Sequence, residues 1–478
     1  MRLFFCGLFI SLFFSVKSFS QLRLPSVISS GMVLQQNDSV TFWGWGSSGQ
    51  QVKITGSWNN STTSGTISNT ARWSFKMKTP AAGGPYTILI SSSGNEITLN
   101  DVMIGEVWLC SGQSNMEWSY YNGAAYIKQE LPDCYNKNIR FFQIPRVASD
   151  YPQDDLKAQW KICDSNSLKS FSAVGYYFGK KLQHDLDVPV GLINSSWGGT
   201  PAETWTPAES IYNNDVLKKA AAELKEAPWW SVKPGLNFNG MIAPVTNYAI
   251  AGAIWYQGEA NVGTNSTYSL LLTTMIDSWR NKWNKDFPFY YVQIAPYKYG
   301  NQNAGALLQE QQTKTMSHAK TGMVVVTDLI DSVTNIHPSN KRDVGVRLAN
   351  WALAETYNKD AGVYKSPLFK KAEITKDKMV LSFDNIPNGL MAKDKIITGF
   401  YISGEKEEWL PAEARIVHGT PSGEKDRIIA WNKKLKQPAQ VRYGFGNTII
   451  GNVFSKEGLP LTPFRTDDWP VEQDPEKN

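Results

Sequence analysis

The sequence is poor in residues that commonly bind metals. It holds four histidines among 478 residues, and they show no spacing typical of metal ligands. We therefore expect neither a metal nor another cofactor. Lysine and arginine form no dense block and the formal net charge is +5, so nucleic-acid binding has no support. A chain of this length and composition is expected to form about two to four globular domains.

A long apolar run occurs at the start of the chain. Residues 1–20, MRLFFCGLFISLFFSVKSFS, have Arg2 in front of an apolar stretch from Leu3 to Val16, and small residues before Gln21. The stretch is too short for a membrane-spanning helix of about 20 apolar residues, but its order is typical of a cleavable secretory signal. We therefore expect an exported protein, periplasmic or secreted, that does not associate with a membrane after the signal is removed.

Cysteine is also scarce. Once residues 1–20 are removed, Cys110, Cys134 and Cys163 remain. A disulfide between Cys134 and Cys163 would suit an oxidising compartment, whereas buried free thiols are the plainer interpretation, and the sequence does not decide between them.

Both ends of the mature chain have patterns typical of β-structure. In residues 21–102, short β-rich runs are cut by Gly, Ser and Asn clusters: SVTFWGWG, QQVKITG, RWSFKMK, PYTILISS and NEITLNDV. They predict a small antiparallel β-sandwich. Similar runs return in KMVLSFDN, KIITGFYIS, RIIAWN and QVRYGF, so we expect a C-terminal β-rich region over residues 361–478.

Residues 103–360 instead alternate apolar strand-like runs with helical stretches. The runs are EVWLCS, VPVGLINSS, IAGAIWYQ, FPFYYVQIA and GMVVVTDL. Apolar residues recur at spacings of three and four over residues 171–182 and 272–283, and a further helix is expected from Lys341 to about Thr356. This order predicts an α/β domain with a parallel sheet and helices on both faces.

Polar segments follow the predicted strands, where an open parallel sheet binds its ligands. They include SGQSNMEW, NSSWGGTPAETWTP, YQGEAN and DLIDSVTNIHPSNKRDVGVRLA. We expect these segments to meet at one rim, which would bring together Ser114, Gly198, Gly199, Gln257, Glu259, Asn261 and His337.

Ser114 and His337 are candidates for nucleophilic catalysis, although nothing around Ser114 matches the G-x-S-x-G motif. A serine hydroxyl needs a positioned base, most often histidine. Of the histidines, only His337 follows a predicted sheet strand, and Pro338 holds it in extended backbone. Each has a plainer interpretation, because Ser114 can cap the helix that it precedes and His337 can bond a carbonyl.

Acyl transfer also needs hydrogen-bond donors for the developing oxyanion. The sequence offers the Ser114 amide at a strand-to-helix turn, the Gly198–Gly199 pair, and the side chains of Gln257 or Asn261. The two glycines can instead serve only a tight turn.

Other polar and aromatic residues near the motifs also have two interpretations. Gln257 and Glu259 end a predicted buried strand and can merely tie loops together by hydrogen bonds. Trp118, Trp197 and Trp205 flank the motifs, where they can stack on a sugar ring or pack in the core.

Five motifs in order resemble the sialate O-acetylesterase family of the SGNH hydrolase superfamily. They are GEVWLCSGQSNMEW, GLINSSWGGTPAETW, FNGMIAPV, GAIWYQGEAN and NIHPSNKRDVGVRLA, and SKEGLPLTPFRTD resembles the family's closing segment. The resemblance implies a flavodoxin-like α/β hydrolase domain that cleaves O-acetyl esters on sugars. It makes Ser114 the nucleophile, His337 the base, and the Ser114 amide, Gly198 or Gly199, and Gln257 the oxyanion donors.

The chain departs from the superfamily pattern at one position. Many of these enzymes carry an acid three residues before the histidine, and here that residue is Thr334. Asp328, Asp331 and Glu259 are alternatives for orienting His337, as is a backbone carbonyl, and the sequence favours none of them.

We therefore predict an exported serine esterase that removes acetyl groups from carbohydrate, with sialate as the first substrate to consider. Acetylated plant polysaccharide such as xylan is the alternative substrate. A carbohydrate-binding protein on an inactive esterase scaffold is the alternative class. The sequence does not reveal the oligomeric state.

Overall fold

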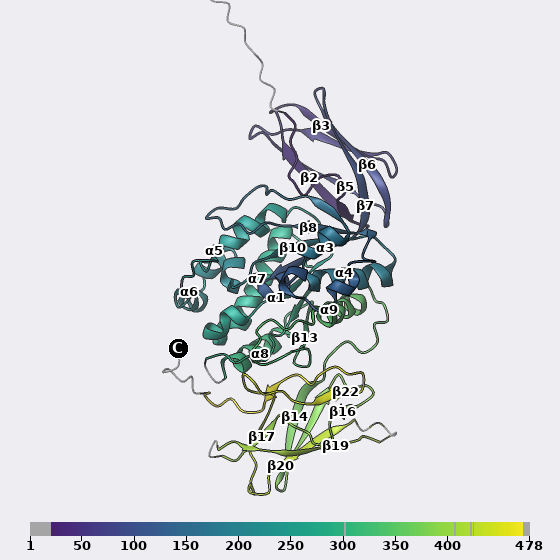
Figure 1. Ribbon diagram of the computed structural model, residues 1–478. Coiled ribbons are helices and arrows are strands. Elements are labelled where there is room, and N and C mark those ends of the chain that lie inside the picture. The colour runs from purple at the N-terminus through teal and green to yellow at the C-terminus, as the bar shows by residue number, and fades with distance from the viewer. Residues whose placement is uncertain (1–20, 301–302, 406–407, 421–422, 424, 472–478) are drawn as a thin grey trace, which may run out of the picture.

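The computed structural model describes residues 21–300, 303–405, 408–420, 423 and 425–471. The predicted signal, residues 1–20, lies outside the described residues. Figure 1 shows a β-rich part at the N-terminal end, a central part that contains the helices, and a second β-rich part at the C-terminal end. We propose residues 21–102, 103–360 and 361–478 as the corresponding domains.

The N-terminal part is built from two groups of strands. Strand β2 pairs with β5 in an antiparallel ribbon, while β3 lies between β4 and β6, and β6 pairs with β7. Alternate residues of β3, including Val52 and Ile54, are fully buried, as expected for a sheet with one face on a core. The strands are β1 Val33–Gln35, β2 Ser39–Trp45, β3 Gln51–Gly56, β4 Ser61–Thr66, β5 Arg72–Lys78, β6 Gly83–Ser92 and β7 Asn95–Gly112.

Strand β7 belongs to both the N-terminal and the central part. Its first half pairs with β6, and its second half, from Glu106 to Gly112, pairs with β10 and β11 of the central sheet. The predicted boundary at residue 102 therefore lies inside one continuous strand. This strand carries the chain from the N-terminal part directly to the segment that contains Ser114.

The central sheet has the order β13-β12-β11-β7-β10-β8-β9, and all its pairs are parallel except that of β8 with β9. The order β10-β7-β11-β12-β13 is that of flavodoxin-like sheets, in agreement with the predicted fold class. Strands β8 and β9, which the sequence pattern does not indicate, extend the sheet beyond β10. The strands are β8 Asn136–Gln143, β9 Trp160–Cys163, β10 Val190–Ser196, β11 Gly252–Tyr256, β12 Phe289–Val292 and β13 Thr321–Val324.

Helices cover both faces of this sheet. Helices α4 (Ala173–Leu186) and α9 (Lys341–Glu355) share a core with Trp108 and Ile254 of the sheet. Helices α7 (Tyr268–Trp283) and α8 (Ala304–Thr315) share another with Leu109 and Trp255. Successive strand residues point to opposite faces, so near-continuous apolar strands serve two cores. The short helices are α1 Ser114–Glu117, η1 Tyr120–Asn122, α2 Ile127–Glu130, α3 Ser165–Ser170, η2 Ala202–Trp205, α5 Ala208–Tyr212, α6 Asp215–Ala222, η3 Phe238–Ile242, η4 Ala243–Val245 and η5 Glu259–Thr267.

The described residues of the C-terminal part form two four-stranded sheets and one strand pair. The sheet orders are β14-β15-β20-β19 and β18-β17-β21-β23, and β16 pairs with β22. Arg465 reaches the central part through a paired contact with Glu310 on α8, with N–O distances of 3.0 and 3.1 Å. The strands are β14 Leu368–Thr375, β15 Lys378–Asp384, β16 Leu390–Ala392, β17 Phe400–Ser403, β18 Leu410–Pro411, β19 Glu413–Val417, β20 Arg427–Trp431, β21 Gln440–Tyr443, β22 Val453–Ser455 and β23 Phe464–Arg465.

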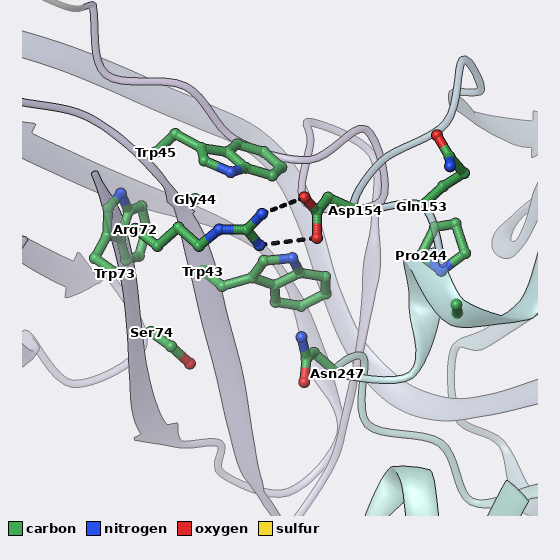
Figure 2. Close-up of a pocket in the computed structure, with 11 residues that line it drawn as sticks. Trp43, Gly44, Trp45, Arg72, Trp73, Ser74, Gln153, Asp154, Pro244 and Asn247 are labelled. Atoms are coloured by element: carbon green, nitrogen blue, oxygen red, sulfur yellow. Dashed lines mark hydrogen bonds and ion pairs between the residues drawn. The ribbon is translucent and has the colours of Figure 1, made fainter. Parts of the chain in front are cut away.

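A cleft of about 290 Å³ lies between the N-terminal and central parts. Figure 2 shows the Arg72 guanidinium extending from β5 across this cleft to the carboxylate of Asp154, with Trp43 and Trp45 beside it. Both charged side chains are about half exposed, and an ion pair of this kind contributes about 0–1 kcal/mol to stability. The Arg72–Asp154 pair therefore adds little to the attachment that β7 already provides.

The cysteines left open by the sequence are free thiols. Cys110, Cys134 and Cys163 are all buried, and the Cys163 thiol donates to the backbone carbonyl of Cys134 over 3.1 Å. The interpretation as buried thiols therefore holds in this structure. No helix within the described ranges is both long enough and apolar enough to cross a membrane.

Candidate active site

Ser114 lies at the first position of α1, directly beyond the carboxyl end of β7. Gly112 makes the approach tight, because its φ is +139° and a side-chain carbon there would lie 2.2 Å from the Tyr256 carbonyl oxygen. The Gln113 amide donates to that same carbonyl over 3.0 Å. Glycine is therefore required where β7 turns into the helix, and the turn fixes the position of the serine.

His337 lies in the segment between β13 and α9, and its Nε2 is 2.8 Å from Ser114 Oγ. Its ring stacks on Trp118, with a centroid distance of 4.1 Å and an interplanar angle of 19°. The His337 amide donates to the Asn335 side chain over 3.0 Å. The two predicted candidates, 223 positions apart in sequence, are thus brought into hydrogen-bond contact.

The surroundings of His337 keep its imidazole neutral near pH 7. Burial, together with the smaller effect of the nearby Lys341 ammonium, lowers its pKa from 6.5 to about 4. A neutral imidazole can accept a proton from Ser114, which is the form that a general base requires.

None of the three carboxylates considered for orienting His337 bonds to it. Asp328 pairs with both terminal nitrogens of Arg347, at 2.8 and 2.7 Å. Asp331 accepts from the amide and hydroxyl of Ser339. In the described part of the chain, His337 Nδ1 has no hydrogen-bond partner, and the ring is held instead by Trp118 and Ser114.

The third carboxylate, Glu259, belongs to a buried polar network beside the pair. Asn115 Nδ2 donates to Glu259 Oε1 over 2.6 Å and to the Ile336 carbonyl over 3.0 Å. Lys341 Nζ donates to Asn115 Oδ1 over 2.5 Å. Asn115, the residue after Ser114, therefore bonds to the backbone of Ile336, the residue before His337.

Burial perturbs both charged members of this network. Burial raises the pKa of Glu259, although the hydrogen bond from Asn115 and the charge of Lys341 act in the opposite direction. Burial also lowers the pKa of Lys341 to about 7, although the nearby Glu259 carboxylate favours the charged ammonium. Sequence reasoning missed Asn115 and Lys341 as site residues. Both lie inside the quoted motifs, but nothing in the chain spacing indicated that they would meet.

The predicted oxyanion donors differ in whether their N–H groups have partners. The Gly198 amide donates to Glu117 Oε2 over 3.0 Å, and Glu117 also pairs with Arg146. Within the described ranges, the amides of Ser114 and Gly199 donate to no protein acceptor. Of the predicted backbone donors, these two amides are therefore the ones without a described protein acceptor.

The side chain of Gln257 is fully used inside the protein. Its Nε2 donates to the Thr200 carbonyl over 3.2 Å and to Asn261 Oδ1 over 2.8 Å, and its Oε1 accepts from Tyr268. Asn261 in turn donates to Glu203 Oε2 over 2.8 Å. In this arrangement Gln257 and Asn261 tie together the loops after β10 and β11, which was the plainer interpretation of Gln257.

The three tryptophans near the motifs have different surroundings. Trp205 is fully buried and its Nε1 donates to Thr200 Oγ1 over 2.8 Å, so it packs in the core. Trp197 is partly buried against the same core. Trp118 is partly buried against the core on the α4 and α9 side of the sheet, one of the two uses considered from the sequence, and it also stacks on His337.

Comparison with known proteins agrees with this architecture. A family described as carbohydrate esterase, sialic acid-specific acetylesterase, matches residues 104–354. Human sialate O-acetylesterase is 28% identical over 434 residues, covering 83% of both chains. The mouse protein of that name is 26% identical and covers 82% of this chain and 84% of its own length. A carbohydrate acetylesterase from Xanthomonas citri is 33% identical in its crystal structure, covering 94% of this chain and 100% of that chain, with a TM-score of 0.84.

Proposed function

Because the chain belongs to the family of sialic acid-specific carbohydrate acetylesterases, and is therefore a carboxylic ester hydrolase, we propose that it removes O-acetyl groups from sialic acids. The observation that carries the chemistry is the 2.8 Å contact between Ser114 Oγ and His337 Nε2. Ser114 is the nucleophile and His337 the general base of this proposal.

The reaction proceeds in two halves. His337 Nε2 takes the proton of Ser114 as Oγ attacks the acetyl carbonyl carbon, and the sugar oxygen then leaves with that proton as an alcohol. His337 next takes a proton from water, whose oxygen attacks the acetyl-serine carbonyl carbon. Ser114 Oγ takes that proton back as its bond to the acetyl group breaks, and acetic acid leaves and ionises to acetate. The low pKa of His337, about 4, keeps its imidazole in the neutral form that a base requires at neutral pH.

The amides of Ser114 and Gly199 are our proposed oxyanion donors. Both N–H groups lack an acceptor among the described residues, whereas the Gly198 amide is bonded to Glu117. Gln257 supports the site indirectly, by holding Thr200 and Asn261. Donors already in place stabilise a developing negative charge without reorganising as the reaction proceeds.

Acetate release by a Ser114→Ala variant tests the chemistry. We expect kcat for an O-acetylated sialic acid to fall by about 10⁴-fold or more, because the nucleophile is removed. Ser317→Ala, at an exposed serine just beyond α8, is the matched control and should retain wild-type kcat. Full activity in Ser114→Ala, with a wild-type circular dichroism spectrum, would contradict the proposed mechanism.

The same assay on acetylated xylan tests the substrate. We expect the higher kcat/KM with acetylated sialic acid, since the family and the mammalian relatives carry that specificity in their descriptions. A preference for xylan would move the substrate to plant polysaccharide and leave the chemistry intact. Sugar binding without acetate release from either substrate would instead favour a non-catalytic binding protein.

We also propose that the protein is exported to the periplasm or secreted. The support is the order of residues 1–20, with Arg2 before an apolar run and small residues before Gln21. A processed chain that begins at Gln21 is the result expected from mass spectrometry. Recovery of the unprocessed chain from the cytoplasm alone would contradict export.

A further inference from the structure

Trp229 is the most exposed tryptophan of the chain, with 77% of its surface accessible. The tryptophans of the cleft in Figure 2 are already covered: Trp43 is 7% and Trp73 is 3% exposed, and the Arg23 guanidinium lies 4.1 Å above the ring centre of Trp45. An exposed apolar side chain alone is common and needs no explanation. What makes Trp229 informative is its neighbour in the chain.

Trp230, the next residue, lies against the glycine pair beside the nucleophile. A side-chain carbon built on Gly199 would lie 2.5 Å from Cδ2 of the Trp230 ring, so the ring occupies the space beside that glycine. A carbon built on Gly198 would lie 3.2 Å from Cβ of Ser114. The contacts therefore run from Ser114 through Gly198 and Gly199 to the indole of Trp230.

Hydrogen bonds hold the segment that carries both tryptophans. Ser231 Oγ bonds to the Asn237 side chain and lies 3.2 Å from Thr204 Oγ1, and the Gly235 amide donates to the Glu203 carbonyl over 3.1 Å. Glu203 and Thr204 belong to η2, which closely follows Gly199. The segment that carries the two tryptophans is thus held to η2, the short helix that follows Gly199.

Polar side chains lie beside Gly198, the residue before the glycine that Trp230 covers. Glu117 Oε2 accepts from the Gly198 amide, and Glu117 Oε1 accepts from Arg146 Nε over 2.6 Å. The Arg146 side chain is 55% exposed. A sugar ring presents apolar C–H faces and a rim of hydroxyls, and a site that combines aromatic faces with charged hydrogen-bonding groups suits both features.

We propose that Trp229 and Trp230 form an aromatic wall that stacks on the pyranose ring carrying the acetyl ester. This inference rests on the proposed acetylesterase function and assigns sugar binding to residues outside the catalytic pair. Trp230 is the inner part of the wall, against Gly199, and Trp229 is its solvent-exposed part. The wall supplies affinity for the sugar and takes no part in proton transfer.

Trp229→Ala tests the wall by comparing two esters. The first is the acetylated sugar that the wild-type enzyme hydrolyses, and the second is triacetin, which has neither a sugar nor an aromatic ring. We expect the ratio of kcat/KM for the sugar ester to that for triacetin to fall about 2- to 12-fold, the range for loss of one aromatic stacking contact. The fall should lie mainly in KM for the sugar ester.

Two further variants complete the test. Trp229→Phe keeps an aromatic face and should restore most of the ratio. Tyr135→Ala is the control, because it removes a ring that is 69% exposed and lies just before the amino end of β8. Ser114 lies beyond the carboxyl ends of the parallel strands, so this variant should leave the ratio unchanged. An unchanged ratio in Trp229→Ala, or an equal loss of kcat/KM on both esters, would contradict the proposal that the wall stacks on the sugar. An inactive wild-type enzyme on every sugar ester, or an active Ser114→Ala, would instead overturn the proposed function.

Discussion

At the scale of single residues, three neighbours act on the imidazole of His337. Ser114 bonds to Nε2, Trp118 stacks on the ring face, and the buried Lys341 ammonium disfavours the protonated form. Serine hydrolases of the Ser-His-Asp type use a carboxylate that orients the histidine and stabilises its cation. Here stacking on Trp118 orients the His337 ring, and the charge of Lys341 opposes protonation of His337.

Replacing Lys341 by methionine should change the pH dependence of the reaction. The charge of Lys341 lowers the pKa of His337, so its removal raises that pKa from about 4. The base works only when neutral, so the acid limb of kcat/KM against pH moves to higher pH. Burial, the larger cause of the shift, persists in the variant, so the limb should stay below the ordinary value of 6.5.

A pH profile separates this electrostatic effect from simple damage to the fold. Loss of the Lys341–Asn115 hydrogen bond alone would lower kcat without moving the limb. Lys341→Arg keeps the positive charge and should keep the limb near its wild-type position. A limb that does not move in Lys341→Met would show that the charge has no effect on the base.

At the scale of elements, apolar periodicity predicted the parts of the central sheet that carry the site. Strands β7, β10, β11, β12 and β13 and helices α4, α7 and α9 all lie where the pattern placed them, within a few residues. Strand β8 was missed because Arg140 interrupts its run of apolar residues. Arg140 is 2% exposed, and its charge is met by Asp101 of β7, with N–O distances of 2.6 and 3.0 Å. No local pattern reveals a partner so far along the chain.

The loops show the same limit for the site. Their positions beyond the strands predicted that Ser114 and His337 would meet, because parallel strands end at one edge. Their internal hydrogen bonds were not predictable, since these depend on which side chains meet across loops. Gln257 donates to Thr200 and Asn261, and the Gly198 amide donates to Glu117. That the Gly198 amide already has an acceptor within the protein was therefore visible only in the tertiary structure.

At the scale of the whole molecule, one hydrophobic core joins the N-terminal part to the central sheet. Val52 and Ile54 of β3 belong to the same packed cluster as Trp255 and Trp279 of the central part. The C-terminal part has a separate core that includes Leu381. Cooperative units usually follow shared cores, so the N-terminal and central parts should behave as one unit.

Hydrogen exchange in increasing urea checks this division. We expect β3 and β12 to lose protection in one step, because continuous β7 and the shared core couple them. Strand β15, in the separate core, should lose protection in a different step. Exchange of β3 at a lower urea concentration than β12 would show that the N-terminal part unfolds alone.

The sequence by itself determined the α/β class, the flanking β-rich regions and the pairing of Ser114 with His337. Apolar periodicity is a local property of the sequence and indicates the strands and helices, and the family motifs identify the two residues. Only the tertiary structure decided what surrounds that pair: Trp118 on the imidazole, Lys341 and Asn115 behind it, and Trp230 against Gly199. Those contacts join residues from separate loops, so burial, pKa and ring stacking follow from the folded arrangement rather than from spacing along the chain.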